Sequence, residues 1–267
     1  MPQPRRPKRI LNVLPSRDTE HDWQIDDADA AGLFGTRPKV PKSVDLRADW
    51  WAVGDQGASG SCVGWATADS VLRWHYVKAG RLKPAEKLSI RFVWMAAKET
   101  DEFTRAPTAF IEVAGTSLKA ALDVTRRLGV VKEQVLPFKA GTLYPGTAET
   151  FYATAAQLKT NSYFNLSLNR GGSLEKWRQW IATKGPILTR LDVDQTWQEA
   201  KATKGNLDEY RQDTKDGGHA VAIVGYTPDR FIVRNSWGTT AWGDKGFAYA
   251  SLAYAQEAFT EAYGVEV

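Results

Sequence analysis

Residues 56–62 read QGASGSC, and this stretch governs how the rest of the chain is interpreted. Cys62 is the single cysteine among the 267 residues. It stands where a glycine-rich loop gives way to an expected helix that runs to about Val77. A helix N-terminus favours an anion, and the thiolate is the reactive form of cysteine. A lone helical cysteine is more often a small buried hydrophobe, so a catalytic role for Cys62 requires partners.

The chain offers three histidines as candidate bases. His75 lies on the same expected helix, roughly 20 Å along its axis from Cys62, so we interpret it as a helix-surface residue. His21 lies in a tail of poor periodicity. His219 heads the apolar strand 220–226 after two glycines, where a side chain can face a cleft. We therefore predict that His219 is the base.

Two amide side chains complete a candidate site for acyl transfer. Asn235 ends the expected strand 230–235, one short hairpin from His219, and a neutral amide can hold an imidazole in one tautomer. Gln56 precedes Cys62 across the glycine-rich loop, and its amide together with the backbone N–H of Cys62 can bind an oxyanion. The ordinary alternatives are a turn residue at 235 and an exposed loop residue at 56.

Together these motifs resemble those of the papain family of cysteine peptidases. The matching stretches are QGASGSC at 56–62, GHAVAIVGY at 218–226 and NSWG at 235–238. The resemblance implies that Gln56 supplies the oxyanion-hole amide, Cys62 the nucleophile and His219 the base. It also implies that Asn235 is the orienting amide and that Trp237 shelters the asparagine–histidine bond.

The resemblance also implies substrate contacts. Gly60 and Ser61 lie in the loop before the nucleophile, and Trp237 is expected to line the substrate path. Gly115 and Thr116 stand where the family usually has two glycines beside the substrate backbone. One departure is that a serine replaces the family's disulfide cysteine in the loop before Cys62, which suits a reducing compartment.

The order of the expected elements indicates an α+β chain. Helices are expected over 62–77, 90–98, 117–128, 147–158 and 174–183. Strands are expected over 187–193, 220–226, 230–235 and 246–250, with an insertion around 196–216. By resemblance this becomes a papain-like fold with two lobes and an active-site cleft between them. We expect a mainly helical lobe over 43–145 with the nucleophile and a strand-rich, barrel-like lobe over 146–267 with the histidine and asparagine.

Residues 1–42 are expected to form an N-terminal extension that covers part of the cleft. Their periodicity is poor, but apolar residues from Leu11 to Phe34 are too frequent for a fully solvated tail. The basic residues Arg5, Arg6, Lys8 and Arg9 suggest a nucleic-acid or membrane tether. Because no aromatic residues interleave them, we favour a solvated segment and expect neither a nucleic-acid nor a membrane partner.

The amino-acid composition limits the class of protein, the kinds of site and the cell compartment that we expect. Apolar residues make up 43% and charged residues 25%, with a net charge of +4, which is ordinary for a globular protein. No apolar run reaches the roughly 18 residues of a membrane span, and the N-terminus has no secretory signal. One cysteine excludes an intrachain disulfide and, with three histidines, argues against a metal site. We expect a cytoplasmic protein without metal or cofactor.

The sequence therefore predicts a cysteine endopeptidase that hydrolyses a peptide or protein substrate through a thioester on Cys62. Two alternatives stay open. The same site can serve an acyl transferase or peptide ligase, in which an amine replaces water. The chain can also be a non-catalytic peptide-binding relative, although the intact set of motif residues argues against it.

Overall fold

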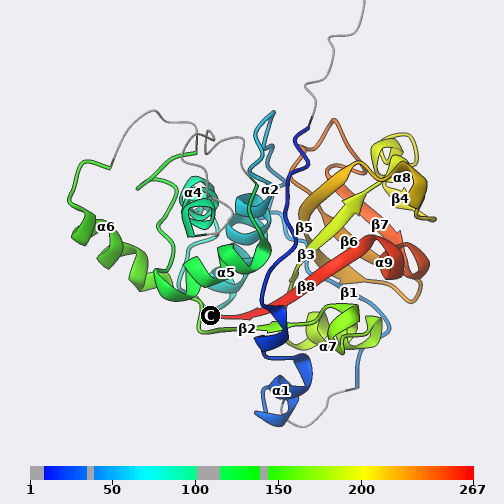
Figure 1. Cartoon of the computed structure of the whole chain (residues 1–267), viewed down its shortest axis with the longest axis horizontal. Helices are drawn as coiled ribbons and strands as arrows, with labels where there is room; N and C mark the ends of the chain where they lie inside the picture. Colours follow the sequence, from blue (N-terminus) through cyan, green and yellow to red (C-terminus); the bar gives the residue numbers. More distant parts are fainter. Residues whose placement is uncertain (1–8, 35–38, 101–114, 139–143) are drawn as a thin grey trace, which may run out of the picture.

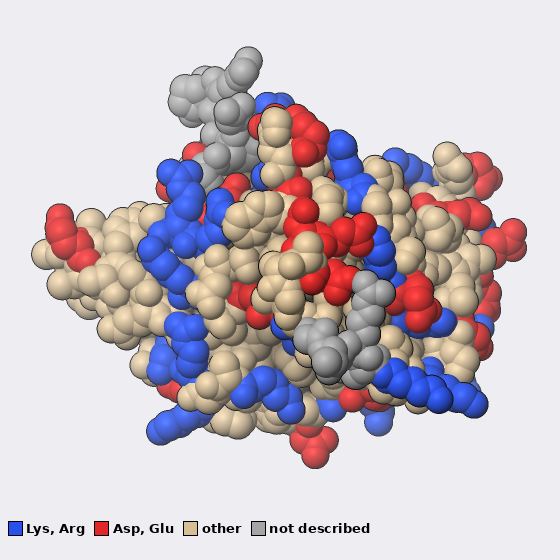
Figure 2. All heavy atoms as spheres, turned by 90° about the horizontal axis from the view of Figure 1, so that it is seen from below, with Lys and Arg blue, Asp and Glu red and all other residues tan. Residues whose placement is uncertain are grey.

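The computed structural model describes residues 9–34, 39–100, 115–138 and 144–267. One side of the molecule is mainly helical, the other holds a mixed sheet with further helices, and the N-terminal segment runs between them (Figure 1). Arg5, Arg6 and Lys8 lie outside the described residues. On the face drawn in Figure 2, acidic and basic side chains lie next to one another. Within the described ranges, no helix is long and apolar enough to span a membrane.

One continuous helix begins at Cys62 and passes through the middle of the molecule. It is built from α2 (Cys62–Gly64), the π-helical section η2 (Trp65–Leu72) and α3 (Arg73–Lys78). The predicted helix is confirmed, although no sequence pattern indicated the π-helical section, a feature common near functional sites. His75 was wrongly expected at the surface. It is only 8% exposed, because α3 is central and the histidine ring packs edge-on against Trp74.

The other predicted helices begin at a hydroxyl side chain that accepts a hydrogen bond from the third helical N–H. They are α4 (Ile90–Thr100), α5 (Leu118–Arg127), α6 (Ala148–Ala155) and α7 (Leu174–Thr183), capped by Ser89, Ser117, Thr147 and Ser173. The 3-10 turn η3 (Ala156–Leu158) extends α6, which packs on the core formed by α2–α5. Gly129, at φ +93°, follows α5 in the left-handed conformation that favours glycine.

The sheet has the strand order β2-β8-β3-β5-β6-β7-β4, and β1 pairs with β5. The strands are β1 (Val44–Asp45), β2 (Ser162–Asn165), β3 (Ile187–Val193), β4 (Asn206–Leu207), β5 (Gly217–Tyr226), β6 (Arg230–Arg234), β7 (Phe247–Ser251) and β8 (Phe259–Glu266). All neighbours are antiparallel except β4 and β7. All four predicted strands are present. Because β5 begins earlier than predicted, His219 lies inside the strand, opposite Leu191.

Several elements escaped sequence analysis. They are η1 (Thr19–His21), α1 (Ile25–Ala30), β1, β2, η4 (Leu168–Arg170), α8 (Gln195–Glu199), β4, η5 (Gln212–Thr214), α9 (Leu252–Ala258) and β8. The longest missed strand, β8, contains both Glu261 and Gly264, which break its apolar pattern. Gly264 is required there because a side chain would collide with the Trp180 ring, 2.2 Å from the position of its Cβ.

The N-terminal segment belongs to both hydrophobic cores. Val13 packs into the core formed by the helices α2–α5, whereas Ile25, Ala28 and Phe34 pack into the core between the sheet, α7 and α9. In Figure 1 the segment descends between α2 and β5 and reaches α1 beside α7. The described part of the extension is therefore integrated into the folded body.

Candidate active site

His219 and Asn235 meet where the hairpin of β5 and β6 ends. His219 Nε2 lies 2.7 Å from Asn235 Oδ1, and the same oxygen accepts the backbone N–H of Ser236 at 2.8 Å. Because an amide oxygen can only accept, we infer that Nε2 carries the ring proton. His219 Nδ1 is buried and has no hydrogen-bond partner among the described residues. The imidazole is thus held in the tautomer that leaves Nδ1 as a base.

Cys62 lies at the beginning of α2, which packs against β5. The backbone N–H groups of Ala220, Val63 and Cys62 itself favour the thiolate and act to lower the pKa of Cys62. Ala220 directly follows His219 in β5. The helix terminus and the strand that carries the histidine therefore both place N–H groups near the sulfur.

Burial controls the protonation of this pair. It raises the pKa of Cys62 to about 11, although the three N–H donors act in the opposite direction. Burial lowers the pKa of His219 to about 4, with the Asn235 bond opposing and the charge of Arg9 adding to the shift. Both side chains are 0% exposed. In the arrangement described, burial therefore opposes charge on both the thiol and the imidazole.

Gln56 is a buried residue of a loop that is tied to the strand-rich side. Its Oε1 accepts the Ser236 hydroxyl at 2.8 Å, and its backbone N–H donates to Ser236 O at 2.8 Å. Its Nε2 donates one hydrogen to Ser59 O at 2.9 Å, which leaves a second for a ligand. Ser236 thus fixes which way the amide points. Sequence analysis missed this role, although Ser236 belongs to the NSWG motif.

Tryptophan rings surround the histidine. The Trp237 ring centre lies 5.0 Å from that of His219, and the Trp197 ring centre lies 5.8 Å from it. The Trp242 ring packs at a tilt against that of Trp197, with ring centres 4.4 Å apart. Trp197 belongs to α8, within the region expected as an insertion, and its role was not predicted. Because these rings exclude water, the hydrogen bond between His219 and Asn235 lies in a dry environment.

Comparison with known proteins places the chain in a family. The family model described as papain family cysteine protease matches residues 40–263. The chain belongs to this family. This result confirms the resemblance seen in the three motifs, and the papain-family match spans all of the elements that carry them.

Two relatives and one solved structure illustrate the similarity. Cathepsin L of Sarcophaga peregrina is 26% identical over 219 residues, which is 78% of this chain and 58% of that protein. Cathepsin B-like CP3 of Giardia intestinalis is 26% identical over 219 residues, 78% of this chain and 68% of that protein. Xylellain, a cysteine protease from Xylella fastidiosa, has a TM-score of 0.77 at 20% identity and covers 99% of this chain and 98% of its own.

These comparisons confirm the papain-like α+β fold, because the xylellain match covers nearly the whole chain. The first two curated relatives are longer. This papain-family chain spans 58% of the Sarcophaga protein and 53% of cathepsin L1 from Drosophila melanogaster.

The positions expected to contact substrate instead contact the chain's own N-terminal segment. Val13 N donates to Gly218 O at 3.2 Å, and Leu14 N donates to Thr116 O at 3.0 Å. The segment therefore uses backbone hydrogen bonds to bridge the residue before His219 and the loop before α5. This bridging role of Val13 and Leu14 was not predicted residue by residue.

Asn12 fits against two glycines of the same region. A Cβ at Gly60 would lie 2.7 Å from Asn12 Nδ2, and a Cβ at Gly115 would lie 2.0 Å from Asn12 O. Any side chain at Gly115 would therefore clash with the segment. Ser61 is fully buried, and its hydroxyl lies 2.6 Å from that of Ser59.

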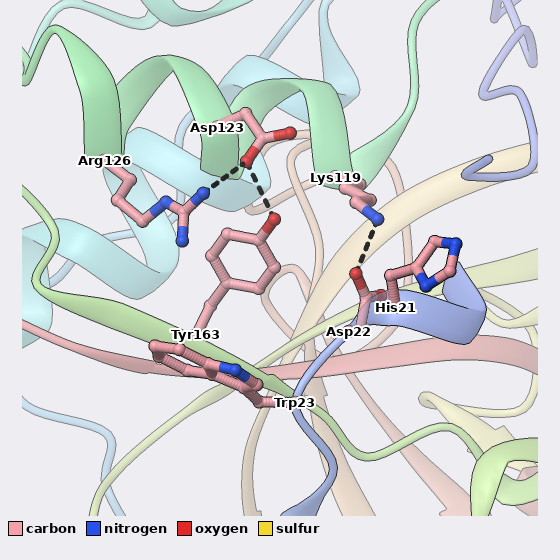
Figure 3. Close-up of a pocket in the computed structure, with 7 residues that line it drawn as sticks. All are labelled: His21, Asp22, Trp23, Lys119, Asp123, Arg126 and Tyr163. Carbon is pink, nitrogen blue, oxygen red and sulfur yellow. Dashed lines mark hydrogen bonds and ion pairs between the residues drawn. The ribbon is translucent and has the colours of Figure 1, made fainter. Parts of the chain in front are cut away.

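A second polar cluster anchors the segment to α5. Lys119 Nζ points at Asp22 Oδ1, 2.6 Å away, while Asp123 contacts Arg126 and the Tyr163 hydroxyl on the same side (Figure 3). The Asp22 side chain is 2% exposed, and its Oδ2 also accepts from Tyr263 and Asn165 at 3.0 Å each. His21 and Trp23 line the adjoining pocket. Among the described residues, no group of three or more histidine, cysteine or acidic side chains is placed to hold a metal.

Proposed function

We propose that this protein is a cysteine peptidase that hydrolyses peptide bonds through Cys62. The observation that carries the proposal is the buried contact between His219 Nε2 and Asn235 Oδ1, 2.7 Å long, which leaves Nδ1 as a base. The thiol lies at the start of α2, which packs against the strand that carries this histidine. Together they supply a nucleophile, a base and an orienting group.

In the proposed reaction, His219 Nδ1 takes the thiol proton and the sulfur attacks the scissile carbonyl carbon. The resulting oxyanion is bound by the backbone N–H of Cys62 and the remaining hydrogen of Gln56 Nε2. The C–N bond breaks as the imidazolium gives its proton to the leaving amine, and a thioester remains on Cys62. Water then attacks the thioester while His219 takes a water proton. The C–S bond breaks, the acid leaves, and the imidazolium returns its proton to the sulfur of Cys62.

We also propose that the N-terminal segment masks this site. Support comes from Asn12, Val13 and Leu14, which bond to or abut Gly60, Thr116 and Gly218, and from the complete burial of both catalytic side chains. A substrate backbone needs the same positions, so it must displace the segment. The extension accordingly acts as a built-in competitor whose dissociation precedes catalysis.

Cleavage of an unfolded protein and of a peptide library, followed by mass spectrometry, tests the proposal. The wild-type chain should release fragments, and Cys62→Ala should abolish them at equal fold content by circular dichroism. Adding an excess of glycinamide separates the alternatives, because a transferase or ligase would give amide products where a peptidase gives acids. If neither fragments nor amide products form, even when Asp22→Asn weakens the hold of the masking segment, the peptidase proposal fails.

We further propose a reducing, cytoplasmic setting, because the lone cysteine is the proposed nucleophile and must stay unoxidised. Fractionation of the native host, with antibody detection of the chain, tests this placement.

A further inference from the structure

Arg9, at the start of the described chain, has its guanidinium bound in a small site on the body. Its Nη1 lies 2.7 Å from Asp55 Oδ1 and donates to Gly57 O at 2.5 Å. The guanidinium carbon lies 5.6 Å from the centre of the Trp237 ring. The arginine side chain is only 17% exposed. A carboxylate, a carbonyl oxygen and an aromatic face together form a site suited to a cation.

This site adjoins the proposed catalytic pair. Asp55 directly precedes Gln56 and pairs with Trp237 through a β-bridge. The Trp237 ring in turn lies 5.0 Å from the His219 ring. Since His219 gives its proton to the leaving amine, the part of a substrate that follows the scissile bond lies on the histidine and tryptophan side. A side chain from that part can reach Asp55.

We propose that Asp55, Gly57 and Trp237 form a subsite for a basic side chain on the leaving-group side. This inference rests on the proposed peptidase function and specifies its substrates as peptides with arginine or lysine shortly after the scissile bond. Arginine is preferred, because a planar guanidinium can lie on Trp237 while it donates to both oxygens. In the full chain, Arg9 occupies the subsite.

The contacts of Arg9 indicate which chemical group the subsite binds, and they are independent of the direction in which a bound substrate runs. All three contacts are made by the guanidinium, so a side chain that arrives from a chain of either polarity can make them. An isolated ion pair on the surface contributes little. Here the cation has three partners and is largely shielded from water, so the site discriminates between a charged and a neutral side chain.

Paired peptide substrates test this inference. One arginine is moved through the first three positions after the scissile bond, and each peptide is matched by one with citrulline, which keeps the shape and loses the charge. The enzyme is full-length Arg9→Ala, in which the subsite is vacated. At the preferred position, kcat/KM for arginine should exceed that for citrulline by about 5- to 20-fold, mostly through KM.

The same ratio should fall to within about twofold in Arg9→Ala/Asp55→Asn. The asparagine keeps the oxygen that accepts the Gly57 N–H at 2.9 Å, so the loop is preserved. Asp229→Asn is the matched control, since it removes an equal charge from a 77% exposed residue in the β5–β6 turn. An arginine preference that survives Asp55→Asn, or that is absent throughout, would overturn the subsite.

A second measurement separates this failure from that of the peptidase proposal, because it needs no turnover. The rate at which iodoacetamide alkylates Cys62 is measured in wild type, Arg9→Ala, Asp55→Asn and the double variant. If Asp55 binds the guanidinium, each single variant should speed alkylation, and the double variant should be no faster than Arg9→Ala. Additive effects would contradict the pairing even in a chain that cleaves no peptide.

Discussion

Arg234 of β6 and Asp69 of η2 form a buried ion pair, with Nη2 and Oδ2 2.7 Å apart and side chains that are 0% and 4% exposed. Arg234 directly precedes Asn235, and Asp69 lies on the helix that begins at Cys62. The Asp69 carboxylate also binds Arg73 Nη1 at 3.1 Å, and Arg234 donates to the Ser70 hydroxyl. The pair therefore links the helix of the proposed nucleophile to the strand of its orienting amide.

Replacing Asp69 with alanine should destabilise the protein by about 3–5 kcal/mol, because two buried guanidinium groups would lose their counter-charge. Urea unfolding followed by tryptophan fluorescence measures this change. The matched control is Glu199→Ala, which breaks the exposed Arg211–Glu199 pair, 3.4 Å long, and should cost less than about 1 kcal/mol. Equal costs for the two variants would show that the buried pair has no special structural role.

Ser236→Ala should lower kcat by about tenfold with little change in KM, because the Gln56 amide would lose the hydroxyl that fixes its orientation. Gln56→Ala should lower kcat by roughly 100-fold. If Ser236 acts through Gln56, the double variant should match Gln56→Ala alone. A double variant that is a further tenfold slower would mean that Ser236 acts independently of the glutamine.

The candidate catalytic residues were predictable because each lies in a motif that is local in sequence. Cys62 follows a glycine-rich loop, His219 lies near the start of β5 and Asn235 directly follows β6 of the same hairpin, so short-range patterns indicate their relationship. The Asp69–Arg234 pair was not predictable, since its two residues come from distant segments and charged residues are seldom expected inside a core. Trp197 was also not predicted, because its helix α8 is short and its contacts with His219 are made only in the folded chain.

The path of the N-terminal segment was predicted only in outline. Apolar residues between Leu11 and Phe34 indicated that the segment packs on the body, but no pattern in it specifies which groove it enters. Its contacts beside the proposed site include backbone hydrogen bonds to Gly218 and Thr116, which any non-proline residue can make. The buried Asp22 could not be distinguished in sequence from its exposed neighbours Asp26 and Asp27, since all three lie in one acidic stretch.

Asp22→Asn should loosen the N-terminal segment from α5. The substitution keeps the size of the side chain but removes the charge that faces Lys119 at 2.6 Å (Figure 3). We expect alkylation of Cys62 to become about tenfold faster, and peptidase activity to rise in parallel. Asp26→Asn is the control, because Asp26 lies in the same segment and forms an ion pair with Lys176 while 74% exposed. Similar rates for both variants would contradict the anchoring role of Asp22.

The pH dependence of Cys62 alkylation tests whether the segment covers a neutral pair. Burial lowers the pKa of His219 to about 4, so the covered pair takes up a second proton only as the pH falls towards that value. Burial raises the pKa of Cys62 to about 11, so the covered pair loses its one proton only as the pH rises towards that value. Between these limits the covered pair holds one proton, on the sulfur.

An uncovered thiolate–imidazolium pair would also hold one proton over most of this range, now on the histidine. Binding of the N-terminal segment over Cys62 and His219 would then neither take up nor release a proton. Alkylation of the full chain should therefore be slow and nearly independent of pH between about 5 and 8, because the thiolate fraction of the uncovered form stays constant, as it does for papain's cysteine with a pKa of about 3–4. Asp22→Asn should give the same flat profile at a higher rate.

Glu261 affects the rate of Cys62 alkylation only at the acid end of this pH profile. It accepts the Ser16 N–H of the segment at 2.9 Å; burial raises the pKa of this carboxyl, whereas the contact with Ser16 lowers it. Glu261→Gln removes this titrating group and should leave the flat profile between about pH 5 and 8 unchanged. An ordinary thiol behaves differently, since its alkylation rate rises about tenfold per pH unit up to a pKa near 8.5. A tenfold rise per unit in both Asp22→Asn and Glu261→Gln would show that Cys62 is an unactivated buried thiol, and the proposed catalytic pair would be wrong.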